Sequence, residues 1–503
     1  MSGVHISSVD ITSNGPVLPG PAAFFNGLHV VSLQSVIRRQ LLFAPGDTVD
    51  TLLVGETMRR LRAQRLFTDA KILATRCDPS GGVALTVSTV DTWTLRPRAQ
   101  LRTGSQLSLG VEDRNFLGTG KSVSLTREYT MRGNGAAFAF SDPFFFGPHV
   151  SASGRLANLA GGHTLRFGVR KHDYSVFDDW KAEGNLSRLS FGDTIVGERA
   201  LHTITAMTMV GRRIGGGLGG STLLLIGAEF DSAASISPSK RAVGPDLAHT
   251  RSFAGIDVGL QRRTAQFDSA SWIVPGRGFI DIPLGLEGEG VVATGYERGL
   301  SRAAMKLDAW MGRVWMPHRG SILMVDGWAS SYFGSGMDRN RITRGAVSFY
   351  DAAARGMWAA RVTAEQLLEV DPDRRGLSLM AVADRTTPVV RHWAARGGKS
   401  VAASLGRDVH LFHAGGASVV NVGGFLAGSY RWEVMDVPDQ SLRVGVVGAR
   451  LRVLSANGTV SSVRLDVGFP VVRSEILSPK PYVVLTYGTL FDVSRQRDGR
   501  RTF

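Results

Sequence analysis

The chain has 503 residues, a formal net charge of +15, 61 glycines, 19 prolines and one cysteine. This length suggests two domains or one large barrel. The absence of a glycine period excludes a collagen-like chain, and one cysteine excludes a disulfide framework and a cysteine-based zinc site. The lone Cys77 is predicted to be a small, buried strand residue rather than a reactive thiol.

The first 94 residues mix helical and strand patterns. The pattern predicts a strand over 4–11, a short helix through Val36 and Ile37 capped by Ser32, a turn at Pro45-Gly46, a helix over 50–64, and a hairpin of strands over 70–77 and 83–90. The order is β-α-α-β-β, which is typical of a small α+β domain.

From about residue 95 the chain alternates apolar with polar or small residues. The segment 463–469 is the clearest example, because Val463, Leu465, Val467 and Phe469 alternate with Arg464, Asp466 and Gly468. One apolar and one polar face predict a transmembrane antiparallel barrel, with 463, 465, 467 and 469 toward lipid and 464 and 466 toward the lumen. A soluble sandwich or propeller is the alternative, but no repeat of about 40–50 residues is found.

The charge and the chain start bear on location. Positive residues are spread through the strand-like segments without long runs, which favours a cationic lumen or contact with anionic lipid over nucleic acid.

No segment reaches about 18 consecutive apolar residues, so no transmembrane helix is expected. The first residues lack the features of a signal peptide. Since a barrel needs export, we expect the recorded start to be internal or already processed.

Several strings resemble enzyme motifs and fail in context. Gly118-Thr119-Gly120-Lys121-Ser122 lacks the earlier glycine of a phosphate loop, since position 115 is Asn115, and a strand pattern follows it. The run 215–220 is followed by strand residues, so it is interpreted as a glycine turn. No catalytic group, cofactor or metal site is predicted.

The N-terminal motifs resemble a known module. The segment Phe43-Ala44-Pro45-Gly46-Asp47, the helix ending in Leu61-Arg62, and Phe67-Thr68-Asp69-Ala70 are similar to a POTRA domain of the BamA/TamA outer-membrane superfamily. The matching motif residues are Pro45, Gly46, Asp47, Arg62 and Phe67. The resemblance implies a periplasmic POTRA-like domain over 1–94.

The start and end of the second part resemble the barrel of the same superfamily. Asp113, Asn115, Phe116, Gly118 and Gly120 match the turn that follows an early barrel strand, and Asp142-Pro143-Phe144 resembles the next hairpin. Arg464 to Pro470 resembles the penultimate strand. The resemblance implies an outer-membrane β-barrel over 95–503, with 16 strands, whose first strand (97–111) pairs with its last (481–493).

The family also has an Arg-Gly pair on a loop folded into the barrel. Arg375-Gly376 matches it best, with Leu377 in place of the usual aromatic residue. The resemblance implies that Arg375 pairs with an inward polar residue. The candidates are Asn421, which stands where the family has an acidic residue, and Asp466. An ordinary loop pair is the alternative.

The function implied is insertion or secretion of client proteins through strand pairing at a barrel seam or through the lumen. The expected partners are client outer-membrane or secreted proteins, outer-membrane lipid and periplasmic accessory proteins, with no nucleic acid and no cofactor. The rivals are a passive outer-membrane pore, an outer-membrane enzyme, for which no catalytic set is found, and a soluble basic β-protein. The sequence does not distinguish insertion from secretion.

Overall fold

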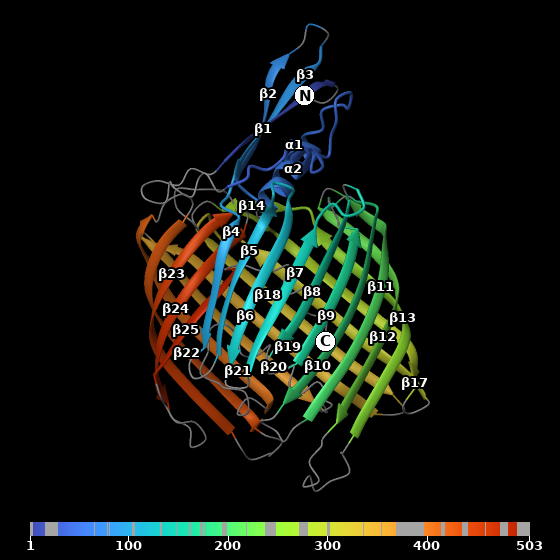
Figure 1. Ribbon diagram of the computed structural model, residues 1–503, viewed down its shortest axis with the longest axis vertical. Helices are drawn as coiled ribbons and strands as arrows, with labels where there is room; N and C mark the ends of the chain where they lie inside the picture. Colours follow the sequence, from blue (N-terminus) through green and yellow to red (C-terminus); the bar gives the residue numbers. More distant parts are fainter. Residues whose placement is uncertain are drawn as a thin grey trace.

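A computed structural model shows a small α/β unit standing on one end of a large β-barrel (Figure 1). The structure describes residues 4–15, 29–64, 66–77, 79, 81–102, 106–130, 133–147, 149–159, 162–171, 175–176, 178–193, 199–217, 219–236, 248–270, 280–298, 302–334, 337–353, 355–368, 397–413, 418–434, 441–457, 459–472 and 481–489.

The N-terminal unit is a three-stranded sheet with two helices. Its elements are β1 (Ile6–Asn14), α1 (Gln34–Arg38), α2 (Thr51–Ala63), β2 (Phe67–Cys77) and β3 (Val83–Asp91). The sheet order is β1-β3-β2, with β1 parallel and β2 antiparallel to β3. The predicted order of strands and helices is therefore confirmed. No helix among the described residues is long and apolar enough to cross a membrane.

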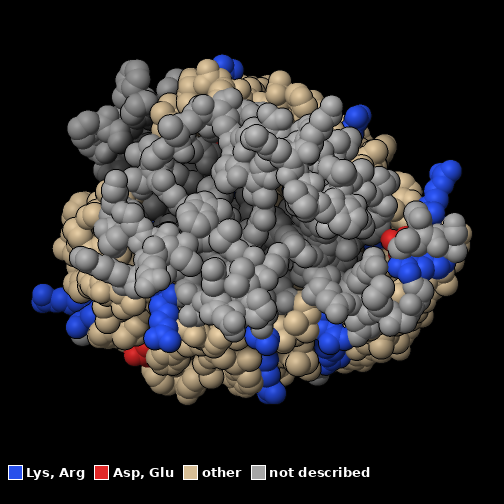
Figure 2. All heavy atoms as spheres, turned by 90° about the horizontal axis from the view of Figure 1, so that it is seen from below, with Lys and Arg blue, Asp and Glu red and all other residues tan. Residues whose placement is uncertain are grey.

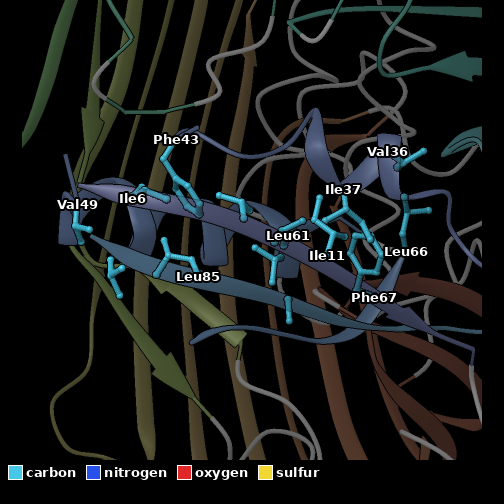
Figure 3. Packing of buried hydrophobic residues seen from close by; sticks show 14 of the residues in the cluster. Ile6, Ile11, Val36, Ile37, Phe43, Val49, Leu61, Leu66, Phe67 and Leu85 are labelled. Carbon is cyan, nitrogen blue, oxygen red and sulfur yellow. The ribbon is translucent and has the colours of Figure 1, made fainter. Parts of the chain in front are cut away.

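The core of this unit lies between the sheet and the helices (Figure 3). Ile37 and Leu61, one from each helix, are fully buried against sheet residues such as Ile6 and Phe67. Burying a side chain of this size contributes about 1.5–3 kcal/mol. Asp50 begins α2 by accepting a hydrogen bond from the Leu52 amide at 2.8 Å, which is a typical helix cap.

Two local predictions for this unit are wrong. Ser32 does not cap α1: the residue before the helix is Leu33, and no side chain caps it. The Ser32 amide and hydroxyl bind distant residues instead, Asp91 and Asn115, and these contacts replace local capping. Cys77 is a strand residue as predicted, but it is exposed rather than buried, as are the β2 residues from Leu73 to Arg76 before it.

Twenty strands form the barrel, in one antiparallel sheet whose two ends, β4 and β25, meet. The strands are β4 (Leu95–Arg102), β5 (Gln106–Phe116), β6 (Lys121–Thr130), β7 (Gly133–Asp142), β8 (Val150–Leu159), β9 (Gly162–Lys171), β10 (Trp180–Asp193), β11 (Arg199–Gly217), β12 (Gly220–Ile236), β13 (Ala248–Thr264), β16 (Gly285–Glu297), β17 (Arg302–Trp315), β18 (Ser321–Gly334), β19 (Met337–Ala353), β20 (Gly356–Leu368), β21 (Gly397–His413), β22 (Ser418–Val434), β23 (Ser441–Asn457), β24 (Thr459–Val472) and β25 (Tyr482–Thr489). Between β13 and β16, β14 (Phe267–Ala270) and β15 (Ile280–Pro283) form a separate hairpin.

The predicted fold class is confirmed, but the strand number is not. The described residues form 20 barrel strands rather than 16. Part of the difference lies in the predicted first strand over 97–111, which is two strands, β4 and β5. The chain reverses between Arg102 and Gln106, and Leu101 then pairs with Leu107. The apolar alternation therefore continues in phase across the turn, and the sequence pattern hides the reversal.

The two faces of the barrel wall differ sharply. Val463 and Phe469 lie on the outer face with 42% and 50% of their surface exposed, whereas Arg464 and Asp466 are buried on the inner face. The same outer face continues around the sheet with exposed apolar residues such as Ile256. An apolar exterior around a polar interior is what a lipid-facing barrel requires. These placements agree with the alternation in the sequence.

Candidate functional site

A hydrogen-bonded turn between β5 and β6 joins the N-terminal unit to the barrel. The Asn115 side chain at its centre is buried. Its Oδ1 accepts from the Gly120 amide at 2.8 Å, and its Nδ2 donates to Ser32 Oγ at 2.9 Å. The Asp113 carboxylate accepts from the Asn115 amide at 3.0 Å. One side chain thus orders the turn and ties it to the segment before α1.

Two glycines allow this turn to approach the N-terminal unit closely. Gly118 and Gly120 both have a φ of +73°, which other residues adopt only with strain. A Cβ at Gly118 would lie 2.6 Å from the Val31 carbonyl oxygen, and one at Gly120 would lie 3.0 Å from Val36 Cγ1. The Gly118 carbonyl also accepts from the Leu33 amide at 2.9 Å. Both positions therefore require glycine for conformation and for space.

The turn between β7 and β8 makes a second, apolar contact. Phe144 inserts into the core of the N-terminal unit, and the Arg39 guanidinium lies 5.5 Å from the centre of its ring. Asp142 holds this turn by accepting from the Phe144 amide at 2.8 Å. On the same turn, burial lowers the pKa of the His149 imidazole below its usual value, and the nearby Arg60 guanidinium lowers it further.

Asp91, the last residue of β3, binds residues of β1 and of the segment before α1, near the contact between the N-terminal unit and the barrel. Its buried carboxylate accepts from the Ser32 amide at 2.7 Å and from Ser13 Oγ at 3.1 Å, and it contacts His29 Nε2 at 3.1 Å. Sequence reasoning missed this residue. A lone aspartate at the end of a strand has no local pattern that distinguishes it from a turn residue.

The β14–β15 hairpin, here called the cap hairpin, lies at the barrel mouth beneath α2 (Figure 1). The Arg59 guanidinium of α2 lies 4.4 Å from the centre of the Phe267 ring, and Arg62 lies 3.9 Å from Asp281. On its other side the hairpin packs against inward-facing residues from distant parts of the wall, namely Val314, Ile322, Val419 and Leu454. The hairpin therefore bridges the mouth between β17–β18 and β22–β23.

The POTRA-like motif residues form a turn and part of the core. Gly46 has a φ of +93°, and its amide donates to the Ile6 carbonyl at 2.8 Å. The Asp47 carbonyl accepts from the Ile6 amide at 2.8 Å, and Pro45 is exposed beside it. Phe67 is buried in the core. In the barrel-start turn, Phe116 is 44% exposed.

Buried charges gather on the inner face of β21, β23 and β24. Asp466 is fully buried and lies 2.8 Å from Arg450 Nε and 2.9 Å from Arg464 Nε. Arg452 forms an ion pair with Asp408. These five residues link three strands across the inner face, and because charges buried away from water must be paired, the network is sensitive to any single loss.

The loop pair Arg375-Gly376 lies outside the described residues, so its predicted contact stays a prediction. Its two candidate partners differ in whether their side chains already have partners. Asp466 already has two arginine partners. Asn421 is buried on β22, and its Oδ1 has no hydrogen-bond partner among the described residues. Asn421 therefore has the free acceptor.

The two ends of the sheet meet at a thin seam. β4 and β25 have eight residues each. Between them one pair of residues is in register, Val484 with Arg102. Each of these strands makes eight pairs with its other neighbour, β24 or β5. Among the described residues the seam is therefore the least paired junction of the barrel.

The N-terminal sheet has one available edge among the described strands. The outer edge of β1 is partly occupied, because Ile6 exchanges hydrogen bonds with 46–47, the Val4 carbonyl accepts from the Val49 amide, and the Ile11 carbonyl accepts from Gln34 Nε2. No described strand pairs with the outer edge of β2. β2 also contacts β23, on the wall that leads through β24 to the seam.

Comparisons with known proteins give similar structures at low identity. No protein-family model matches the chain, and no curated protein matches it. CdiB from Escherichia coli matches with 12% identity and a TM-score of 0.47, covering 96% of this chain and 76% of that one. BamA from Haemophilus ducreyi, in a form lacking POTRA domains 1–3, matches with 11% identity and a TM-score of 0.38, covering 97% and 85%. BauA, the ferric preacinetobactin receptor from Acinetobacter baumannii, matches with 10% identity and a TM-score of 0.35, covering 84% of each chain.

The likeness is one of fold alone. One of the matched structures is BamA, whose superfamily the sequence motifs resemble. The receptor BauA matches with a TM-score close to that of BamA, although it is a protein of a different kind. Scores of this size transfer no activity, which has to be argued from the chain itself.

Proposed function

We propose that this chain is an outer-membrane factor that inserts or secretes client proteins without bond chemistry. In this proposal the barrel spans the outer membrane, and the N-terminal unit is a POTRA-like domain in the periplasm. The partners are unfolded client proteins, outer-membrane lipid and periplasmic accessory proteins. Its action is strand pairing and passage, so it needs no cofactor.

The seam between β4 and β25 is the observation that supports this proposal most. A hydrogen bond contributes about 0.5–1.5 kcal/mol net, so a junction with one pair in register costs far less to open than one with eight. Opening exposes two strand edges, and unpaired edges are costly in lipid. A client strand that pairs with either edge removes that cost by β-augmentation.

The free edge of β2 supplies a matching step before insertion. An extended client segment adds to this edge through main-chain hydrogen bonds, which do not depend on its sequence. β2 lies beside β23, close to the seam in the order of the sheet. A client held there is delivered toward the seam rather than to the far side of the barrel.

A passive pore is the second candidate, and the cap hairpin argues against it. The hairpin bridges the mouth of the barrel, and α2 lies on top of it. A bridge across the mouth narrows the route that a small solute would take through the lumen. Secretion through the lumen would require the hairpin to move, whereas insertion through the seam would not.

A disulfide across the seam tests the proposal. In a Cys77→Ser background, Arg102→Cys with Val484→Cys places two thiols on the one pair in register. Directly paired residues lie within disulfide range. We expect the oxidised protein in vesicles to lose its ability to insert a urea-unfolded eight-stranded barrel protein, and dithiothreitol to restore it.

The control disulfide joins Val447→Cys with Phe469→Cys, a pair between β23 and β24 in the same sheet. It should not affect insertion, because that junction does not need to open. Full insertion by the seam-locked protein would rule out the seam mechanism.

A further inference from the structure

The outer face of the barrel has a groove that the proposed function does not use. It crosses β5 to β11 and has a volume of about 1050 Å³. Its floor is a row of apolar residues in direct register from strand to strand, namely Val111, Leu125, Phe138, Leu156 and Leu165. This row faces outward, because cross-strand partners share a face and these five are between 40% and 55% exposed.

The row ends in a cluster of basic side chains. On β10 the partner of Leu165 is Arg188, which is exposed. His163 on β9 and His202 on β11 lie on either side of Ser190, which is two residues from Arg188 on the same face of β10. Arg127 adds a further positive charge to the groove lining, and none of the described residues that line the groove is acidic. The groove therefore has an apolar length and a basic end.

The basic end lies toward the end of the barrel away from the N-terminal unit, because His163 is the second residue of β9, and the β7–β8 turn that contacts that unit is at the opposite end of β8. Barrel strands tilt, so a row that crosses them at right angles runs obliquely through the membrane. An arginine is costly at the midplane and cheap near the interface. Figure 2 shows that Lys and Arg side chains also stand around the rim at the end away from the N-terminal unit, with few acidic ones among the coloured residues. The end of the barrel toward which the groove's basic cluster lies is therefore positively charged.

We propose that this groove binds an anionic, phosphate-bearing lipid of the surrounding leaflet. Its phosphate pairs with Arg188, whose planar guanidinium donates two hydrogen bonds to such a group, and His163 and His202 flank it. Its acyl chains lie along the apolar row. An ordinary lipid-facing wall is convex, whereas this one has a cavity in which a single chain gains contacts on more than one side.

Lipid retention by the purified full chain tests this proposal. The protein is reconstituted in vesicles that hold equal amounts of phosphatidylglycerol and phosphatidylcholine with identical acyl chains, extracted, and analysed by native mass spectrometry. We expect it to retain phosphatidylglycerol several-fold over phosphatidylcholine. Arg188→Gln should abolish that preference. Arg212→Gln, an exposed arginine on the outer face of β11 outside the groove lining, should leave it intact.

Ala136→Trp fills the groove without changing its charge. It should reduce retention of both lipids, which separates the groove from simple surface charge. Equal retention of the two lipids by the unmodified protein, or a preference that persists in Arg188→Gln, would overturn the proposal. If Arg188→Gln does not fold, the double variant His163→Gln with His202→Gln replaces it. Client insertion is measured on the same samples, so loss of the lipid preference with normal insertion leaves the proposed function standing.

Discussion

At the scale of single residues, buried polar side chains decide how the two parts of the molecule meet. Asn115 binds Ser32 and the Gly120 amide. Asp91 binds the Ser32 amide and the Ser13 hydroxyl, so both side chains hold the segment before α1. A buried polar group that loses its partner costs more than the hydrogen bond contributed, because it cannot return to water. The junction is therefore specific as well as stable.

Asn115→Ala should loosen the N-terminal unit from the barrel. The substitution removes the acceptor for the Gly120 amide and the donor to the Ser32 hydroxyl. We expect a cost of about 1–3 kcal/mol, seen as faster proteolytic release of the N-terminal unit while the barrel stays heat-modifiable on gels. Asn134→Ala, at an exposed position on β7, is the control and should behave as the unmodified protein. Equal release rates in both variants would show that Asn115 does not hold the junction.

The pair Asp466 and Arg450 should be strongly coupled. A double-mutant cycle with Asp466→Asn and Arg450→Gln should give a coupling of about 0.5–3 kcal/mol in the free energy of unfolding, because the pair is buried and 2.8 Å apart. Asp466→Asn with Arg407→Gln, which is exposed, should be additive. Additivity in the first cycle would remove Arg450 from the network.

The predicted contact of Arg375 can be tested in the same way. Cycles of Arg375→Ala with Asn421→Ala and with Asp466→Asn compare the two candidates directly. Asn421 has the free acceptor and Asp466 has two partners already, so we expect the larger coupling with Asn421. Additive effects in both cycles would show that the family's loop motif does not apply to Arg375.

At the scale of elements, each strand keeps one face for the exterior and one for the interior. In β24, Leu465 lies on the outer face, whereas its neighbours Arg464 and Asp466 are buried on the inner face. A strand can hold buried charges on one side only if its other side is apolar along its whole membrane length. Substitutions on the outer face should therefore depend on depth.

Leu465→Arg should destabilise the barrel by about 2–4 kcal/mol, because Leu465 lies near the middle of β24 on its outer face. Val471→Arg, near the end of the same strand, should cost only about 0–1 kcal/mol. Unfolding by guanidinium in vesicles measures both. A similar cost at the two positions would mean that the apolar belt does not cover β24 as described.

At the scale of the whole molecule, the cap hairpin connects the N-terminal unit to the inside of the barrel. α2 contacts it from above, and Ile282 lies below among residues of four strands. The hairpin therefore links α2 to β17, β18, β22 and β23, whereas the seam lies between β25 and β4. The two routes for a client, through the lumen and through the seam, have separate barriers.

Ile282→Glu should weaken the cap hairpin, because it places a charge among buried apolar residues. We expect a higher ion conductance in planar bilayers than that of the unmodified protein. Leu73→Glu, at a position 58% exposed on β2 outside the barrel, is the control for a general effect of the charge. An unchanged conductance would show that the hairpin is not the barrier at that mouth.

The sequence by itself determined the order of elements in the N-terminal unit and the two faces of the barrel wall, because both depend on local periodicity. The alternation at 463–469 indicated the outer and inner faces, and the motif around Asn115 marked a special turn. Only the tertiary structure decided the strand number, since the alternation runs in phase across the reversal between Arg102 and Gln106. It also decided the partners of Asn115, the insertion of Phe144 and the thin seam. These contacts join residues far apart in the chain, and they follow from how the sheet curves back on itself, which no local pattern records.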